Sequence, residues 1–391
     1  MHPPSKESAE EGSIQNFDEI DVTIARNPIN SNNTSKLVGI RTYLSVQAWS
    51  EWTIGEDEFN FDLGHIQLEY VDESSFADHE GFIVSSNNGN SNSLANQITE
   101  IKDIWVWDQP GSQFMATDIS NTPRYLMLKE LHDGDQATID LANFQNMSSR
   151  TLTLSSSNPT QFNQWVYGRT TGSEGGIWLN YFNNVMATGS TAEIYYPTDA
   201  FQEYEVDILS TYDSDNGVHH FYTREIPDQV KKLTGGVTLQ NNSPDNLQLT
   251  TVDNNFDEFK ITSSYEPVGG DSHFWFIYGP PDRSTLSYPV MGEFFTNSYP
   301  SFDKNSFTVS SIELFEYPKL QNGYREANRL LYENGGQSFY EAITEFVRYW
   351  EFVSNSSKTK RLTDIHQEKL KDPRFNHPNR FDVSRSIVND R

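Results

Sequence analysis

Residues 204–223 have the sequence YEVDILSTYDSDNGVHHFYT, and this stretch decides the fold class that the chain predicts. Apolar and polar residues alternate before the turn, which is the period of a half-buried β-strand. Asn216-Gly217 lies between the two runs, and Asn-Gly is typical of tight hairpin turns, whose central residues need positive φ. The stretch therefore predicts a β-hairpin.

The sequence on both sides of this hairpin repeats the pattern of short strands and turns. Residues 37–49 are rich in β-forming side chains, and residues 65–71 alternate apolar with polar ones. Further strands are predicted around residues 104–107, 124–128, 136–141, 151–154, 177–182, 192–196, 236–239, 247–252, 259–262, 274–278 and 306–315. Because no helical periodicity lies between them, the chain predicts an all-β fold of the sandwich or barrel type.

One strand-turn-strand phrase occurs twice. The first copy joins residues 151–157 to Trp165-Val-Tyr-Gly168, and the second joins residues 259–264 to Trp275-Phe-Ile-Tyr-Gly279. A repeat without a chemical motif predicts two tandem antiparallel β-sandwich or jelly-roll modules. We place these modules at residues 36–200 and 201–320, the first being longer, with the Asn/Ser-rich loop at 85–93 as one site of its additional residues.

Helix is predicted only after the second module, in a helical segment over residues 321–355. A shorter helix is expected at 322–333, and a second at 338–353, where Ser338 and Glu341 form a capping box. The apolar residues of the second helix fall on one face. This candidate docking face consists of Phe339, Ile343, Phe346, Val347 and Trp350.

The chain is strongly acidic, with 28 basic and 55 acidic residues and a net charge of −27. Such an excess gives solubility, repels nucleic acid and acidic membranes, and also fits a protein that works in high salt. The tail at 356–391 is the exception, because it is basic. Its candidate partner-contact residues are Lys358, Lys360, Arg361, Lys369, Lys371, Arg374, Arg380 and Arg385. A basic tail on an acidic body can contact the body, a neighbouring subunit or nucleic acid.

The remaining composition excludes several classes of protein. Residues 1–35 are polar and predict a flexible arm without the features of a signal peptide, and no apolar run is long enough for a membrane span. The absence of cysteine excludes disulfides and thiolate sites. No nucleophile elbow, zinc-protease motif or phosphate-binding loop is present. We therefore predict no catalytic residue, no metal ligand and no cofactor.

Three weaker chemical signals remain in the sequence. His219 and His220 are adjacent, so on a strand they point to opposite faces, and only one of them could join His273 or a carboxylate in a site. The eight tryptophans lie mostly within strand patterns, where aromatic side chains form either a core or a sugar-stacking platform. Carboxylates are abundant enough that pairing for glycoside hydrolysis is not visible in the sequence.

Two β modules with terminal arms and a basic tail predict a non-enzymatic structural subunit of a larger assembly. The layout is similar, at the level of fold only, to the double jelly-roll coat proteins of icosahedral viruses. This resemblance implies self-association into homo- or hetero-oligomers and a place in a virion or at a cell surface. Two alternatives stay open: an extracellular carbohydrate-binding β-sandwich, and a polysaccharide hydrolase or lyase that uses paired carboxylates.

Overall fold

A computed structural model describes the conformation of somewhat more than half of the chain. The described residues are 19–26, 39–47, 63–71, 82–86, 91–94, 102–107, 112–118, 123–156, 158–169, 177–179, 187, 189–212, 217–243, 245–253, 255–265, 273–283, 285–286, 288, 302–332 and 342–353. These residues form several β-sheets and one short helix, so the predicted all-β class is confirmed.

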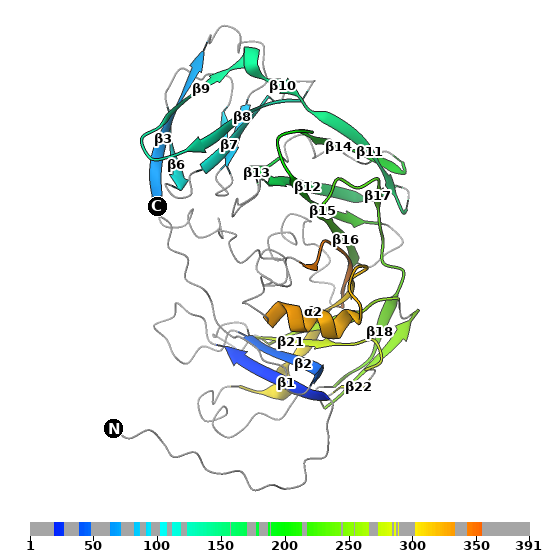
Figure 1. The fold of residues 1–391 in the computed structure, drawn as a ribbon. Coiled ribbons are helices and arrows are strands. Elements are labelled where there is room, and N and C mark those ends of the chain that lie inside the picture. Colours follow the sequence, from blue (N-terminus) through cyan, green and yellow to red (C-terminus); the bar gives the residue numbers. More distant parts are fainter. Residues whose placement is uncertain are drawn as a thin grey trace, which may run out of the picture.

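A ten-stranded sheet, here called the main sheet, dominates the molecule (Figure 1). Its strands are, in spatial order, β1 (Glu19–Arg26), β2 (Gly39–Gln47), β21 (His273–Gly279), β20 (Glu258–Tyr265), β23 (Thr308–Glu316), β24 (Glu345–Phe352), β16 (Gly217–Thr223), β15 (Glu203–Thr211), β12 (Gln161–Arg169) and β13 (Ile177–Trp178). Neighbouring strands are antiparallel except β2 and β21, which are parallel. Strands from distant parts of the chain therefore share one continuous sheet.

Two three-stranded sheets cover one face of the main sheet, which we call the outer face. They consist of β14 (Thr191–Tyr196), β11 (Ser148–Leu154) and β17 (Gln229–Val230), and of β18 (Gly236–Ser243), β19 (Asn246–Val252) and β22 (Thr285–Leu286). Leu152 and Ile194 of the first small sheet share a core with Val166 of β12. Leu247 of the second shares that core with Ile261 of β20. Two sandwich-like halves are thus built on a single sheet.

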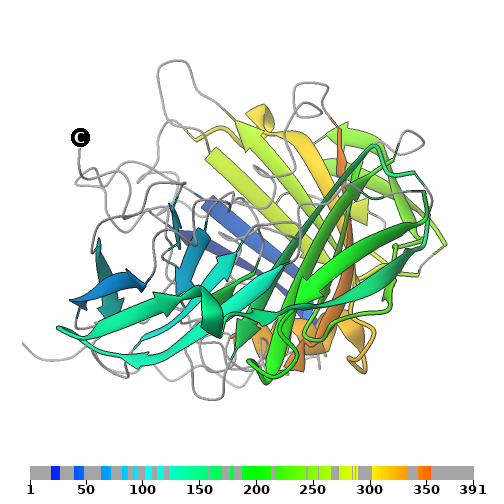
Figure 2. The ribbon, with the colours of Figure 1, turned by 90° about the horizontal axis from the view of Figure 1, so that it is seen from above.

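The described strands between β2 and β11 form a lobe beside the main sheet in both views (Figure 1 and Figure 2). Its two sheets contain β6 (Lys102–Trp107), β3 (Leu63–Val71) and β9 (Gln136–Asp140), and β10 (Gln145–Asn146), β8 (Arg124–Leu131), β7 (Ser112–Asp118), β4 (Phe82–Ser86) and β5 (Ser91–Leu94). Strand β7 connects the lobe to the main sheet, because its side chains alternate between two cores. Phe114 and Ala116 pack in the lobe's own core, whereas Met115 packs in the core that the main sheet shares with the two small sheets.

The opposite face of the main sheet, the inner face, is covered in part by helix α2 (Gly323–Tyr332). Figure 1 shows α2 inside the curve of the sheet. Tyr324 fixes the helix there, because its hydroxyl donates to the carbonyl oxygens of Leu44 and Tyr278 at 2.5 and 3.0 Å. This helix confirms the one expected at 322–333. Two short 3-10 helices, η2 (Leu141–Asn143) and η4 (Lys304–Ser306), each follow an aspartate cap.

The helix predicted at 338–353 is wrong, because residues 345–352 form strand β24 in the middle of the main sheet. Phe346 and Trp350 of the expected helix face lie on the inner face, and Val347 packs in the outer core. Ile343 is buried before the strand begins, and Phe339 lies outside the described residues. Pairing with β16 and β23 buries both faces of β24, which overrides a local helical pattern.

Two further expectations are changed by the strand pairing. The N-terminal stretch predicted as a flexible arm contains β1, which pairs with β2 along its length. In the repeated phrase, β20 and β21 pair as a hairpin, but β11 and β12 belong to different sheets. The two copies are therefore not the same structural unit. The predicted hairpin of β15 and β16 is confirmed.

The division of the chain at residue 200 stays a prediction. Among the described strands, pairing crosses this boundary three times, because β12 pairs with β15, β2 pairs with β21, and β11 pairs with β17.

Candidate functional site

A row of buried ionisable side chains crosses the inner face of the main sheet. We call it the charged row; its members are Arg169 on β12, Glu205 and Asp207 on β15, His220 on β16, Arg348 on β24, Glu313 on β23, and Glu258 and Lys260 on β20. No residue of the row is more than 7% exposed as a whole. Charged residues are rarely so buried unless they are paired, so the contacts of the row decide its role.

The centre of the row is an ion-pair triad around Glu313. Lys260 lies directly opposite Glu313 in the β20–β23 register, and its amine is 3.1 Å from Oε1. The guanidinium of Arg348 donates to Oε2 of the same carboxylate. Aromatic rings complete the surroundings of both cations: Arg348 lies 4.6 Å from the ring centroid of Trp350, and Lys260 lies 5.2 Å from that of Phe276.

Two further pairs continue the row toward β12. Arg169 contacts Oε2 of Glu205 at 3.2 Å, and the Tyr222 hydroxyl donates to Oε1 of the same residue at 3.1 Å. His220 Nε2 is 2.7 Å from Oδ1 of Asp207. Glutamate, aspartate and histidine are thus held by neighbours from adjacent strands, which fixes their orientation.

The adjacent histidines have different surroundings, as the alternation of a strand requires. The ring of His219 lies 4.8 Å from that of Tyr349 and is tilted by 32° relative to it, whereas His220 meets a carboxylate on the inner face. His273, the other predicted partner, packs its ring 5.9 Å from that of Tyr265. Among the described residues, no group of three or more His, Asp or Glu side chains could hold a metal ion.

A second group of carboxylates lies where β20 and β23 meet the start of β24. Burial raises the pKa of Asp257, although the Tyr317 N–H that donates to it at 2.7 Å acts in the opposite direction. Burial also raises the pKa of Glu316, and the negative charges of Asp257 and Glu345 add to the effect while Lys231 opposes it. Lys231 is itself paired with Glu345.

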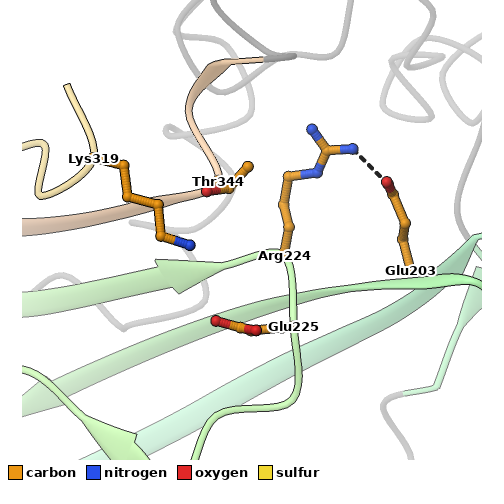
Figure 3. Close-up of a pocket in the computed structure, with 5 residues that line it drawn as sticks. All are labelled: Glu203, Arg224, Glu225, Lys319 and Thr344. Atoms are coloured by element: carbon orange, nitrogen blue, oxygen red, sulfur yellow. Dashed lines mark hydrogen bonds and ion pairs between the residues drawn. The ribbon is translucent and has the colours of Figure 1, made fainter.

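A pocket of about 400 Å³ opens at the ends of four neighbouring strands, β23, β24, β16 and β15 (Figure 3). We call it the strand-end pocket; it is lined by Glu203, Arg224, Glu225, Lys319 and Thr344. The guanidinium of Arg224 turns toward Glu203, at 2.5 Å, and the backbone N–H of Arg224 donates to the Thr344 carbonyl at 2.8 Å. Figure 3 shows the Lys319 side chain on the opposite side of Arg224 from Glu203. Two cations and two carboxylates therefore face one hollow.

The structure places the sequence-predicted site residues unevenly. Of the expected helix face, Phe346, Val347 and Trp350 lie on β24, Ile343 lies just before it, and Phe339 lies outside the described residues. All eight candidate residues of the basic tail lie outside the described part of the chain. The sequence analysis did not predict the charged row or the strand-end pocket. The one pattern that pointed to the row was the alternation that puts Glu205 and Asp207 on the same face of a predicted strand.

The chemistry of the charged row is that of ion pairing inside a sheet. Each carboxylate that could act as an acid or base is held by a cation, a histidine or a tyrosine hydroxyl, for example Glu313 by two cations and Glu258 by the Tyr317 hydroxyl at 2.9 Å. Such contacts position strands against one another, at a desolvation cost.

Comparisons with known proteins add no assignment to these sites. No family model matches the chain, and comparison with curated proteins and with solved structures gives no match. No helix in the described part of the chain is long and apolar enough to cross a membrane.

Proposed function

We propose that this protein is a non-enzymatic structural subunit of a larger assembly, of the kind that forms a viral coat or a surface layer. The observation that carries the proposal is the single ten-stranded sheet with a small sheet packed on each half of its outer face. Two sandwich-like halves that share a continuous sheet form one building block, and a building block with a charged tail suits repetitive assembly. The double jelly-roll arrangement of these halves is part of this proposal.

The distribution of charge supports the same reading. Within the charged row, opposite charges form ion pairs with each other, as in the Lys260–Glu313–Arg348 triad. The acidic excess of the chain lies elsewhere, and the basic tail at 356–391 is its natural counterpart on a neighbour. A role for the tail in contacting nucleic acid is the alternative within this proposal.

Limited proteolysis tests the proposal directly. We expect the tail to resist protease in concentrated protein at the salt concentration where oligomers form, and to be cleaved after dilution to monomers. Cleavage at the same rate in both states would contradict the locking role of the tail.

The carbohydrate-binding alternative depends on exposed aromatic rings. Trp165, Trp275 and Trp350 are buried, so among the described aromatic side chains the best platform is Phe274, which is 38% exposed and stacked on Phe276. A glycan array read with wild-type protein and Phe274→Ala separates this function from assembly: sugar binding that the substitution abolishes would favour it.

The hydrolase alternative depends on carboxylates that face each other across a cleft. Burial raises the pKa of Glu316, and the charges of Asp257 and Glu345 add to this effect, so Glu316 is the candidate acid for this alternative. Release of reducing sugars from a polysaccharide panel, lost in Glu316→Gln, would favour it.

A further inference from the structure

We propose that the strand-end pocket is the docking site for the charged stretch 358–374 of a second copy of this chain. The inference rests on the proposed assembly function and names the surface through which the tail would act.

The pocket is prepared for a ligand that carries both signs of charge. Arg224 is only 15% exposed and is held by Glu203 and by its backbone bond to Thr344, so its position is fixed before anything binds. Glu225 and Lys319 are exposed on the rim. The fixed pair gives the pocket its shape, and the exposed carboxylate and amine are the groups that can reach a partner.

The stretch 358–374 has a matching pattern of charge. It contains six basic residues and three acidic ones, and residues 368–374 read EKLKDPR, so acids and bases alternate over a short length. A basic side chain of this stretch can pair with Glu225 while a neighbouring acidic one pairs with Lys319. The chain as a whole has a net charge of −27, and this charge attracts the basic excess of the stretch.

The length of the tail permits contact between copies. Strand β24 ends at Phe352, and the pocket lies beside Thr344, at the other end of that strand. A segment of about 17 residues spans up to roughly 56 Å when extended, which is more than the length of an eight-residue strand. This length reaches the pocket of the tail's own subunit as well as that of a neighbouring copy, and the mixing experiment below decides between the two.

A charge-swap experiment on the full-length chain tests the proposal. The site variant is Glu225→Lys, and the tail variant combines Lys369→Glu with Lys371→Glu. Each variant alone should associate on the order of tenfold more weakly than wild type, because exposed pairs are each worth a few-fold and reversal adds repulsion. Association is measured from the mass as a function of protein concentration, at low and at high salt.

Mixing the two variants identifies the partner of the pocket. In an equimolar mixture each reversed charge can meet its complement on the other chain, so association should return to within a few-fold of wild type. Docking of the tail on its own subunit predicts no recovery on mixing, and that result would overturn the proposal. Asp133→Lys, at an exposed turn, makes the same change of net charge as Glu225→Lys and should leave association unchanged.

The outcomes separate this inference from the proposed function. If wild type does not associate at all, the assembly function fails. If wild type associates through its tail but Glu225→Lys behaves like Asp133→Lys, only the docking site is wrong. Unchanged far-UV circular dichroism and melting temperature show that each exposed substitution leaves the fold intact.

Discussion

Replacing Glu313 by glutamine tests the account of the charged row. The change keeps the size of the side chain but removes the carboxylate that holds both Arg348 and Lys260. The side chains of these two cations are 4% and 9% exposed, so water cannot replace the lost partner. Breaking a buried ion pair by removing one partner costs about 3–5 kcal/mol. Because two cations share Glu313, we expect a loss of about 4 kcal/mol or more.

The assay is urea unfolding with linear extrapolation to water. Glu326→Gln is the matched control, because it removes the same charge from the exposed pair with Arg329 on α2 and should cost about 0.5 kcal/mol or less. A triple variant with Lys260→Met, Glu313→Leu and Arg348→Met should recover most of the lost stability, since an apolar replacement of a buried ionic triad leaves no uncompensated charge. A loss below about 1 kcal/mol for Glu313→Gln would refute the reasoning.

Three further predictions concern other parts of the fold. Gly217→Ala should destabilise the fold by about 2 kcal/mol, because a Cβ at this position would overlap the Trp350 carbonyl oxygen. Gly236→Ala is the control and should cost less than about 1 kcal/mol, because the nearest atom to its new Cβ would be 3.9 Å away. Thermal melting of both variants and wild type measures the difference. Tyr324→Phe should cost about 1–2 kcal/mol and speed hydrogen exchange in α2, because two buried carbonyls lose their donor; unchanged exchange would contradict this anchoring. The raised pKa of Glu316 means that the folded state binds this proton more tightly than the unfolded state does. The stability that the bound proton gives is present below the ordinary glutamate pKa of 4.5 and is lost as pH rises through the pKa of the folded state. Glu316→Gln should therefore gain stability relative to wild type over that pH range in urea unfolding, and an identical pH dependence of the two unfolding free energies would contradict the assignment.

The strands that the sequence predicted best are those whose pattern is local. The alternation at 204–211 and the turn ending at Gly217 specify the β15–β16 hairpin without help from the rest of the chain. Gly217, however, does not have positive φ, and its small size serves the close approach of Trp350 on β24. The prediction was right about the hairpin and wrong about the reason for this glycine.

The errors arose where distant strands decide the structure. Residues 345–352 read EFVRYWEF, and their aromatic and β-branched content favours a strand, but the spacing of Phe346 and Trp350 also fits a helix. The pairing of β24 with β16 and β23 decides that these residues form a strand, and no sequence pattern predicts which strands will be neighbours. The same limit explains why the two copies of the repeated phrase were expected to form one kind of unit.

The candidate sites were hidden for a related reason. Members of the charged row are separated by up to 179 positions in the sequence, from Arg169 to Arg348, and in an acidic chain an isolated glutamate carries no information about burial. A clearer local pattern, which belongs to neither candidate site, is the Asp-x-x-x-Phe spacing at Asp140 and Phe144, which recurs at Asp303 and Phe307. In both places the aspartate caps a 3-10 helix and the phenylalanine follows it, so the similarity is one of local chemistry.

The most direct test of the assembly proposal is the mass of the particle in solution. Light scattering on the full-length chain, and on a chain that ends at residue 355, should be compared at high protein concentration across a series of salt concentrations. The account predicts oligomers for the full-length chain and a clear loss of mass after truncation. A full-length protein that stays monomeric throughout, or a mass that truncation leaves unchanged, would contradict it.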